Sequence, residues 1–336
     1  MFKRILWLLL LFPWLTGCTG KIENAVLSPV PHEVTSPKGL AENLTRLPIY
    51  WRGVLVYLDG KVIENDPITQ LKNDKSIMLG SYKFSHNGRY LVYRYADVIW
   101  NDSEAFPGFP GLREKMGIWD LETGERKVLV EIGKDFPKET TMEGLAFFPG
   151  DSKVLFSVMW RDNDKTHADL ATVDMESGMI KRLGMYPLPV FSLDLDISPD
   201  GKWAVLAETA TLDNQVCLLV NLEQRTLDCL PLGKGHYIST RLTPNENIVF
   251  VHRLRTSVGV YASEIGGTEN KLLVSGLSSA RIFWTDKGEV IFSGATYDNY
   301  KCSSIYIVNL DGSDFRRLSY LGEECLTDDE LKKMSP

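Results

Sequence analysis

Ile197-Ser198-Pro199-Asp200-Gly201-Lys202-Trp203-Ala204 is the stretch of sequence from which the fold of this chain can be decided. Its Ser-Pro-Asp-Gly core is typical of a turn, because proline presets one backbone torsion angle and glycine accepts a positive φ. Before the turn, Leu193 and Leu195 alternate with polar residues, and this two-residue period is that of a β-strand. The segment therefore predicts a β-hairpin.

The same pattern recurs along the chain at regular distances. Its copies begin at Phe84, Phe147, Ile197, Leu242 and Trp284, so the spacings are 63, 50, 45 and 42 residues. A second, acidic turn follows several of the copies, as at residues 120–124 and 174–178. Periods of about 40–50 residues that contain several short strands are typical of propeller blades.

Two copies carry a family resemblance. The turn at 197–204 and the last copy, residues 305–319, resemble the TolB-like propeller repeat, and Ile118-Trp119-Asp120-Leu121 is also similar to a WD-repeat pattern. The resemblance covers about residues 78–322. It implies an all-β propeller of four-stranded antiparallel blades. Propellers of this kind serve as transport scaffolds, as gatekeepers of peptidases and as binding lipoproteins, so the resemblance implies a fold more firmly than a function.

The repeat predicts where the blades lie. Five are expected, at residues 78–133, 141–185, 190–233, 236–275 and 278–320. Residues 46–77 hold a further hairpin around Leu58-Asp59-Gly60, which we count as a divergent first blade. Six blades are therefore expected. Five blades with an accessory hairpin, or seven with shared strands, stay open at this point.

The first 18 residues have the pattern of a bacterial lipoprotein signal peptide. Lys3 and Arg4 precede the apolar stretch 5–15, which is too short to span a membrane. Leu15-Thr16-Gly17-Cys18 resembles the lipobox, whose cysteine is acylated and becomes the new N-terminus after cleavage. An ordinary secretory signal with an incidental cysteine is the alternative.

The remaining segments follow from composition. Residues 19–45 contain three prolines among polar residues, which predicts an extended tether. Residues 46–322 are expected to form the propeller. Residues 323–336 are expected to form a C-terminal tail with a short helix at 328–334. Thr19 is not the aspartate that retains lipoproteins at an inner membrane. In a Gram-negative host we therefore expect the protein to be attached to the periplasmic face of the outer membrane. In another host we expect it on the outer face of the cell membrane.

The net charge of −7, with both signs interspersed, argues against a nucleic-acid partner, which requires a basic face. We expect a monomer attached to the membrane by its lipid, with a protein or an envelope component as its partner. Neither a metal nor a cofactor is expected, because the sequence has no His-Glu-x-x-His, no Cys-x-x-Cys and no EF-hand loop.

No catalytic motif stands out either. There is no Gly-x-Ser-x-Gly, and the five histidines are scattered. A binding or scaffold role is therefore favoured over catalysis. An enzyme acting at the channel mouth, such as a hydrolase or a lyase, and an accessory domain of a separate peptidase remain as alternatives.

The cysteines predict two disulfides. Setting Cys18 aside leaves four, and an even number in an exported chain is typical of paired cysteines. Equal counting from a turn centred near Glu223 places Cys217 opposite Cys229. Counting across Asp311-Gly312 brings Cys302 near Cys325. Four buried free thiols are the alternative.

Charged residues recur on the strands expected to line the channel. Asp194 and Asp196 alternate with leucines, so both lie on one face of their strand. Lys83, Arg241 and Arg281 occupy equivalent positions in other blades. We expect these five side chains to line the channel and favour salt bridges between neighbouring blades over a ligand site.

One loop is longer than the repeat requires. Residues 96–115 stretch the first spacing to 63 residues and contain Trp100, Phe106 and Phe109. Apolar side chains on a connecting loop suggest a contact surface, so these three are expected to bind a partner. The alternative is that the loop folds back over the propeller face.

Overall fold

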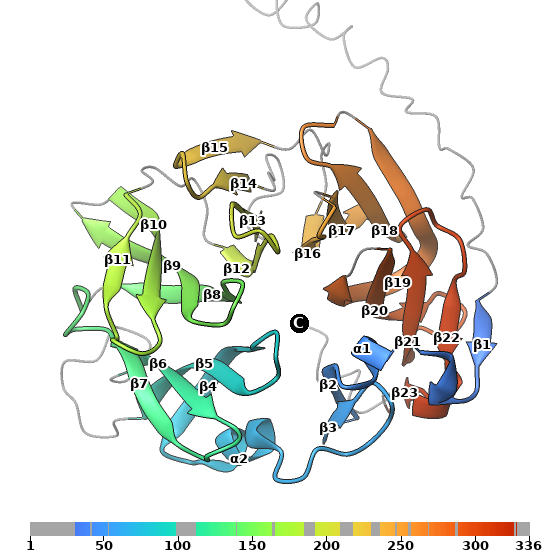
Figure 1. Cartoon of the computed structure of the whole chain (residues 1–336), viewed down its shortest axis with the longest axis horizontal. Helices are drawn as coiled ribbons and strands as arrows, with labels where there is room; N and C mark the ends of the chain where they lie inside the picture. The colour runs from blue at the N-terminus through green and yellow to red at the C-terminus, as the bar shows by residue number, and fades with distance from the viewer. Residues whose placement is uncertain are drawn as a thin grey trace, which may run out of the picture.

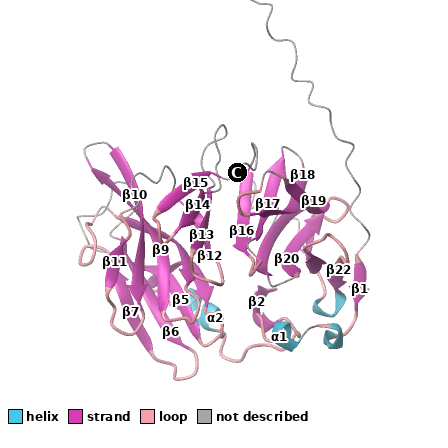
Figure 2. Ribbon diagram, turned by 45° about the horizontal axis from the view of Figure 1, so that its top comes forward, coloured by secondary structure: helices cyan, strands magenta, loops and turns pink. Residues whose placement is uncertain are grey.

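The computed structural model describes residues 31–40, 42–52, 54–98, 112–138, 140–162, 165–184, 192–208, 218–229, 236–245, 247–254, 257–267, 269–285, 288–325 and 327. Within this part the chain is mostly β-strand, and four-stranded antiparallel sheets stand around a common centre as the blades of a propeller (Figure 1). The tilted view shows the same ring almost entirely in strands, with only short helices (Figure 2). The predicted fold class is confirmed.

Three blades each have four strands of their own, numbered outward from the channel. They are β4 (Ile77–Phe84), β5 (Tyr90–Val98), β6 (Leu112–Asp120) and β7 (Arg126–Glu131); β8 (Thr141–Phe147), β9 (Lys153–Asp162), β10 (Lys165–Asp174) and β11 (Ile180–Arg182); and β12 (Ser192–Ile197), β13 (Trp203–Glu208), β14 (Leu218–Asn221) and β15 (Thr226–Cys229). Each sheet is antiparallel throughout, because consecutive strands are joined by hairpins.

The last two blades share a strand. Their strands are β16 (His236–Leu242), β17 (Asn247–Leu254), β18 (Ser257–Glu264), β19 (Asn270–Thr285), β20 (Glu289–Thr296), β21 (Cys302–Asn309) and β22 (Arg316–Leu318). The first part of β19 pairs with β18 as an outer strand, and from Leu277 onward it pairs with β20 as an inner strand. The expected boundary at residues 275–278 therefore falls inside one continuous strand.

The sixth position of the ring holds a smaller unit, made of β2 (Pro48–Trp51) and β3 (Val54–Tyr57) (Figure 1). Ile49 and Trp51 are buried in a cluster with residues of β20 and β21. The expected hairpin is present. It forms a sheet of two strands, whereas a full blade has four, so the count of six blades stays a prediction.

Helix α2 (Pro67–Asn73) follows the hairpin and was not expected from the sequence. Asp66 caps it by accepting hydrogen bonds from the backbone N–H groups of Ile68 and Thr69, and Pro67 occupies its first turn. Ile68 and Leu71 are buried against the blade β4–β7. An aspartate followed by proline and by two apolar residues three positions apart was the signal in the sequence.

The domain begins earlier than expected. Strand β1 (His32–Val34) pairs in parallel with β22, and a 3-10 turn (Pro37–Gly39) and α1 (Glu42–Thr45) follow. Leu44 is only 1% exposed, because it packs into the cluster under β2 and β3. Part of the expected tether, from His32 to Thr45, therefore contacts the propeller, and residues 19–30 lie outside the described residues. At the other end, the expected helix at 328–334 lies outside the described residues.

The inner turns repeat their hydrogen bonds from blade to blade. In the blade β4–β7 the Ser85 hydroxyl donates to Asn87 and accepts from the backbone N–H of Tyr90. In the blade β12–β15 Ser198 does the same with Asp200 and Trp203. The copies identified in the sequence are therefore structurally equivalent. We call the end of the ring that carries these inner turns and the acidic outer turns, such as residues 121–125, the turn side.

In the described part of the chain, no helix is long and apolar enough to cross a membrane.

Candidate functional site

Four of the five charged residues expected at the channel form ion pairs. The Lys83 ammonium lies 3.5 Å from a carboxylate oxygen of Asp196, and the Arg241 guanidinium lies 2.9 Å from Asp194. The pair Asp194–Arg241 joins two neighbouring blades. The pair Lys83–Asp196 joins β4 to β12 past the intervening blade.

The two aspartates also hold the backbone of the next blade. Asp194 accepts a hydrogen bond from the N–H of Thr240 at 3.1 Å, and Asp196 accepts one from the N–H of Leu242 at 2.9 Å. Both donors belong to β16, the inner strand of the adjacent blade. The channel carboxylates therefore brace β12 against β16.

Burial and charge act together on this cluster. Burial would raise the pKa of Asp194, but the charges of Arg241 and Lys83 outweigh it and lower that pKa, so the carboxylate is ionised at neutral pH. Burial, reinforced by repulsion from Arg241, lowers the pKa of Lys83. Arg281, the fifth expected residue, is exposed and has no ion pair within the described part of the chain.

A second buried cluster was missed by the sequence analysis. The guanidinium of Arg94 lies 2.6 Å from Glu143 and donates to the backbone oxygen of Met142 at 2.7 Å, and Glu114 accepts from the N–H of Met142 at 2.9 Å. Burial, with the nearby charge of Glu114, raises the pKa of Glu143 although Arg94 opposes it. This cluster also links two neighbouring blades. The sequence pattern did not indicate it, because in a regular strand Glu143 would lie on the face opposite Ala146, and the bulge between Glu143 and Leu145 changes that register.

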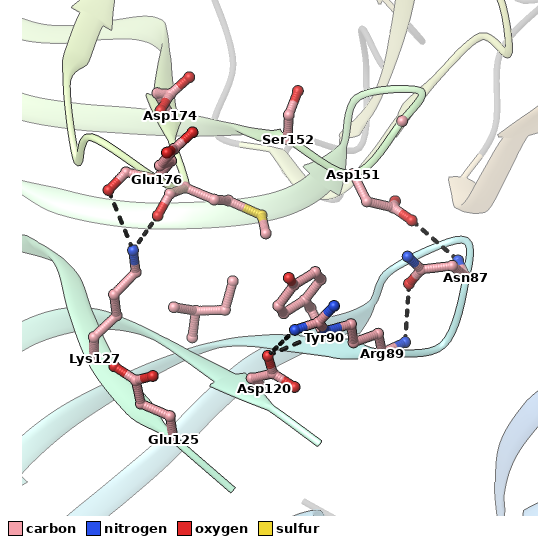
Figure 3. A pocket seen from close by; sticks show the side chains of 13 residues that line it. Asn87, Arg89, Tyr90, Asp120, Glu125, Lys127, Asp151, Ser152, Asp174 and Glu176 are labelled. Carbon is pink, nitrogen blue, oxygen red and sulfur yellow. Dashed lines mark hydrogen bonds and ion pairs between the residues drawn. The ribbon is translucent and has the colours of Figure 1, made fainter. Parts of the chain in front are cut away.

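A groove of about 550 Å³ lies on the turn side, between the blades β4–β7 and β8–β11 (Figure 3). The inner and outer turns of both blades form its walls. Its lining is Asn87, Arg89, Tyr90, Ile118, Asp120, Glu125, Lys127, Gly150, Asp151, Ser152, Asp174, Met175 and Glu176. The side chains of Tyr90, Ile118 and Met175 supply its apolar surface.

An inter-blade clasp forms one end of this groove. Asp151 accepts hydrogen bonds from the N–H groups of His86 and Asn87 at 2.9 and 3.0 Å, and it lies 2.7 Å from the His86 ring nitrogen Nδ1. Burial would raise the pKa of Asp151, but these hydrogen bonds lower it. At the next blade interface the equivalent residues are Gly201 and Pro149, and the Pro149 ring lies 3.6 Å from where a Cβ of Gly201 would stand. A polar clasp thus replaces apolar packing where the groove lies.

The charged residues of the groove differ in how far they are paired. Arg89 lies 2.6 Å from Asp120, and the Lys127 ammonium donates to the backbone oxygens of Met175 and Glu176. The carboxylates of Glu125 and Glu176 are exposed, with neither a hydrogen bond nor an ion pair to any described residue. Five acidic and two basic side chains line the groove, so its local charge is negative.

No family model and no curated protein matches this sequence. Solved structures do resemble it. TolB from Acinetobacter baumannii matches with a TM-score of 0.53 and 15% identity over 84% of this chain and 61% of that one. The chain is a β-propeller similar in fold to TolB.

Two peptidases share the propeller fold. A putative dipeptidyl aminopeptidase IV from Bacteroides ovatus matches with a TM-score of 0.50 and 14% identity over 80% of this chain and 45% of that one. A puromycin-hydrolyzing peptidase of Mycobacterium tuberculosis matches with a TM-score of 0.50 and 13% identity over 75% and 39%. The propeller spans less than two thirds of each of these three structures. At such identities the likeness shows the fold alone.

The propeller contains one of the two expected disulfides in its described part. Cys302, the first residue of β21, is bonded to Cys325 in β23 (Glu324–Cys325), and the two residues are paired in register. In the other expected pair, Cys229 lies opposite Leu218, so the predicted register is wrong by one residue. The reason is that the turn between Asn221 and Thr226 has four residues, which moves its centre beyond Glu223. Cys217 lies outside the described residues.

The remaining expected site residues cannot be placed on this propeller. Cys18 and the three aromatic residues of the long loop, Trp100, Phe106 and Phe109, lie outside the described residues. Their roles in lipid attachment and partner binding stay predictions.

Proposed function

We propose that this chain is an exported, lipid-anchored binding propeller, which engages a protein or envelope component through the turn-side groove. The observation that carries this proposal is how the charged groups are used. The inner-strand charges Lys83, Asp194, Asp196 and Arg241 form ion pairs between blades. In the groove, by contrast, the carboxylates of Glu125 and Glu176 form no hydrogen bond or ion pair with any residue that the structure describes.

Export and anchoring are supported by two observations. The lipobox-like sequence ending in Cys18 predicts acylation, and the disulfide between Cys302 and Cys325 suits an oxidising compartment. Both point to an extracytoplasmic location.

The same fold also supports a second function, as an accessory propeller of a separate peptidase. The observation in its favour is the likeness to peptidase structures, of which this chain spans at most 45% in the two described above. Under this proposal the captured partner would be a peptidase.

The experiment is cross-linked capture from the native envelope with a groove-filling variant. Ser152→Trp places a large side chain on the groove wall, where Ser152 is exposed. The matched control is Lys202→Trp, an exposed and equivalent position of the blade β12–β15. We expect the first variant to lose the partner and the second to keep it, with equal melting temperatures.

Capture by Ser152→Trp as strong as by the unaltered chain would refute the groove as the binding surface. A third variant, Trp100→Ala with Phe106→Ala, then tests the long loop. Loss of capture in that variant alone would move the site to the loop.

A further inference from the structure

We infer that the groove binds a basic segment of a protein partner, an extended stretch that carries lysine or arginine. This inference rests on the proposed function, since it names the class of partner for the same groove. Its first support is charge. Of the groove residues, Asp120, Glu125, Asp151, Asp174 and Glu176 are acidic, whereas only Arg89 and Lys127 are basic.

Three of the acidic groups, Asp120, Asp151 and Asp174, have pKa values below their ordinary value and are ionised at neutral pH. The hydrogen bond from Arg89 lowers the pKa of Asp120, and hydrogen bonds from Ser177 lower the pKa of Asp174. Glu125 and Glu176 come from opposite walls, the outer turns of two adjacent blades. A positive side chain lying between these turns can therefore reach carboxylates on both sides. Opposite charges on two surfaces mainly steer encounter and select the partner.

The groove already holds two cations of this chain. The ammonium of Lys127 donates to the backbone oxygens of Met175 and Glu176, and the guanidinium of Arg89 lies against the Tyr90 ring at 5.0 Å while it pairs with Asp120 (Figure 3). Backbone oxygens, a carboxylate and an aromatic face are thus arranged here as acceptors for ammonium and guanidinium groups.

The apolar surface fits the stems of the same side chains. Of the three apolar lining residues Tyr90 is partly exposed, whereas Ile118 and Met175 are only 3% and 7% exposed and add a small further area. Lysine and arginine lay their methylene groups along apolar surface and keep the charged end in contact with polar groups. An acidic segment would meet the carboxylates of Glu125 and Glu176, which have no partner among the described residues, and like charges disfavour it.

The turn contact beside the groove differs from the contact at the next interface, between the blades β8–β11 and β12–β15. Phe148 and Pro149 approach Gly201 there, with the nearest Pro149 and Phe148 atoms 3.6 and 4.0 Å from where a Cβ would lie. The equivalent residues of the blade β4–β7 are Ser85 and His86, which are smaller or polar.

The test uses two fluorescent eight-residue peptides of alternating glycine and charged residues, one with lysine and arginine and one with glutamate. Binding is measured by anisotropy at low and physiological salt. The groove variant is Glu125→Gln with Glu176→Gln. The control is Glu223→Gln with Glu269→Gln, two exposed turn positions of other blades, so both double variants change the net charge by the same amount.

We expect the basic peptide to bind the unaltered chain and the control equally, and the groove variant about tenfold more weakly. The acidic peptide should bind none of them. Equal weakening in the two double variants would mean general attraction to an acidic protein and would overturn the inference, as would no binding of the basic peptide.

These outcomes separate the inference from the proposed function. If Ser152→Trp abolishes capture but the groove variant binds the basic peptide like the control, the groove is a binding surface for another class of segment. If Ser152→Trp leaves capture intact, the proposed function fails whatever the peptides show.

Discussion

The Lys83 ammonium and the Asp196 carboxylate lie 3.5 Å apart although 113 residues and one whole blade separate them. The contact is possible because the intervening blade has Gly144 and Ala146 at the corresponding inner-strand positions, where no long side chain stands. Asp196 also accepts the N–H of Leu242, so three blades meet at this carboxylate.

A double-mutant cycle measures that link. We expect Lys83→Met to change the free energy of unfolding little, because removing the ion pair also removes the cost of burying the ammonium. Asp196→Asn should lower the free energy of unfolding more than Lys83→Met does, because it also weakens the hydrogen bond that the Leu242 N–H donates. The coupling between the two changes should be about 1 kcal/mol by urea denaturation. Additive effects would mean that the two groups do not interact in solution.

The clasp at Asp151 predicts a pH dependence. Because the pKa of the folded-state carboxyl lies below its ordinary value of 3.8, its stabilising effect is present above that value and is lost as the pH falls through the lower folded-state pKa. Asp151→Asn should therefore lower the free energy of unfolding by about 2 kcal/mol at pH 7. The difference from the unaltered chain should shrink below pH 3.8. A difference that stays constant from pH 7 to pH 3 would show that the charge plays no part.

The disulfide between Cys302 and Cys325 encloses a short segment, with a sequence separation of 23. Non-reducing peptide mapping should recover the two cysteines in one linked pair. Replacing both by serine should lower the free energy of unfolding by about 3 kcal/mol, the value for a loop of this length in the chain-entropy model. Recovery of Cys302 bonded to Cys217 or Cys229 would contradict the register of β21 and β23.

The cap of α2 is a further test of the fold. Asp66 accepts from Ile68, Thr69 and also from the N–H of Leu55 in β3, so it ties the helix to the hairpin. Asp66→Ala should lower the free energy of unfolding by about 1–2 kcal/mol. Asp66→Asn keeps an acceptor oxygen and serves as the control. It should lower the free energy of unfolding less than Asp66→Ala does. Thermal melts of the three proteins decide the comparison.

Membrane attachment depends on Cys18 in the proposed function. Cys18→Ser should release the protein into the soluble fraction, because lipid at this residue is the anchor that the sequence predicts. Fractionation after a high-salt wash is the measurement, since salt removes proteins held only by charge. If the serine variant still sediments with membranes, the lipoprotein interpretation is wrong.

The sequence by itself determined the blade repeat. Turns such as 197–204 and alternating strands depend on neighbours a few residues apart, so a period of 42 to 63 residues could be read directly. Counting residues across a turn also predicted the pair Cys302–Cys325. The same counting was wrong at Cys229, because a turn of four residues shifted the register by one. Helix α2 was not predicted, although its capping aspartate is present in the sequence.

Only the tertiary structure decided which blades contact one another and where the turn-side groove lies. The link from Lys83 to Asp196 depends on two small residues in another blade, and the clasp at the end of the groove joins His86 to Asp151, 65 positions further along the chain. These are contacts between residues far apart in the chain. Their geometry is set by how the twisted blades close around a common axis, which local sequence patterns do not encode.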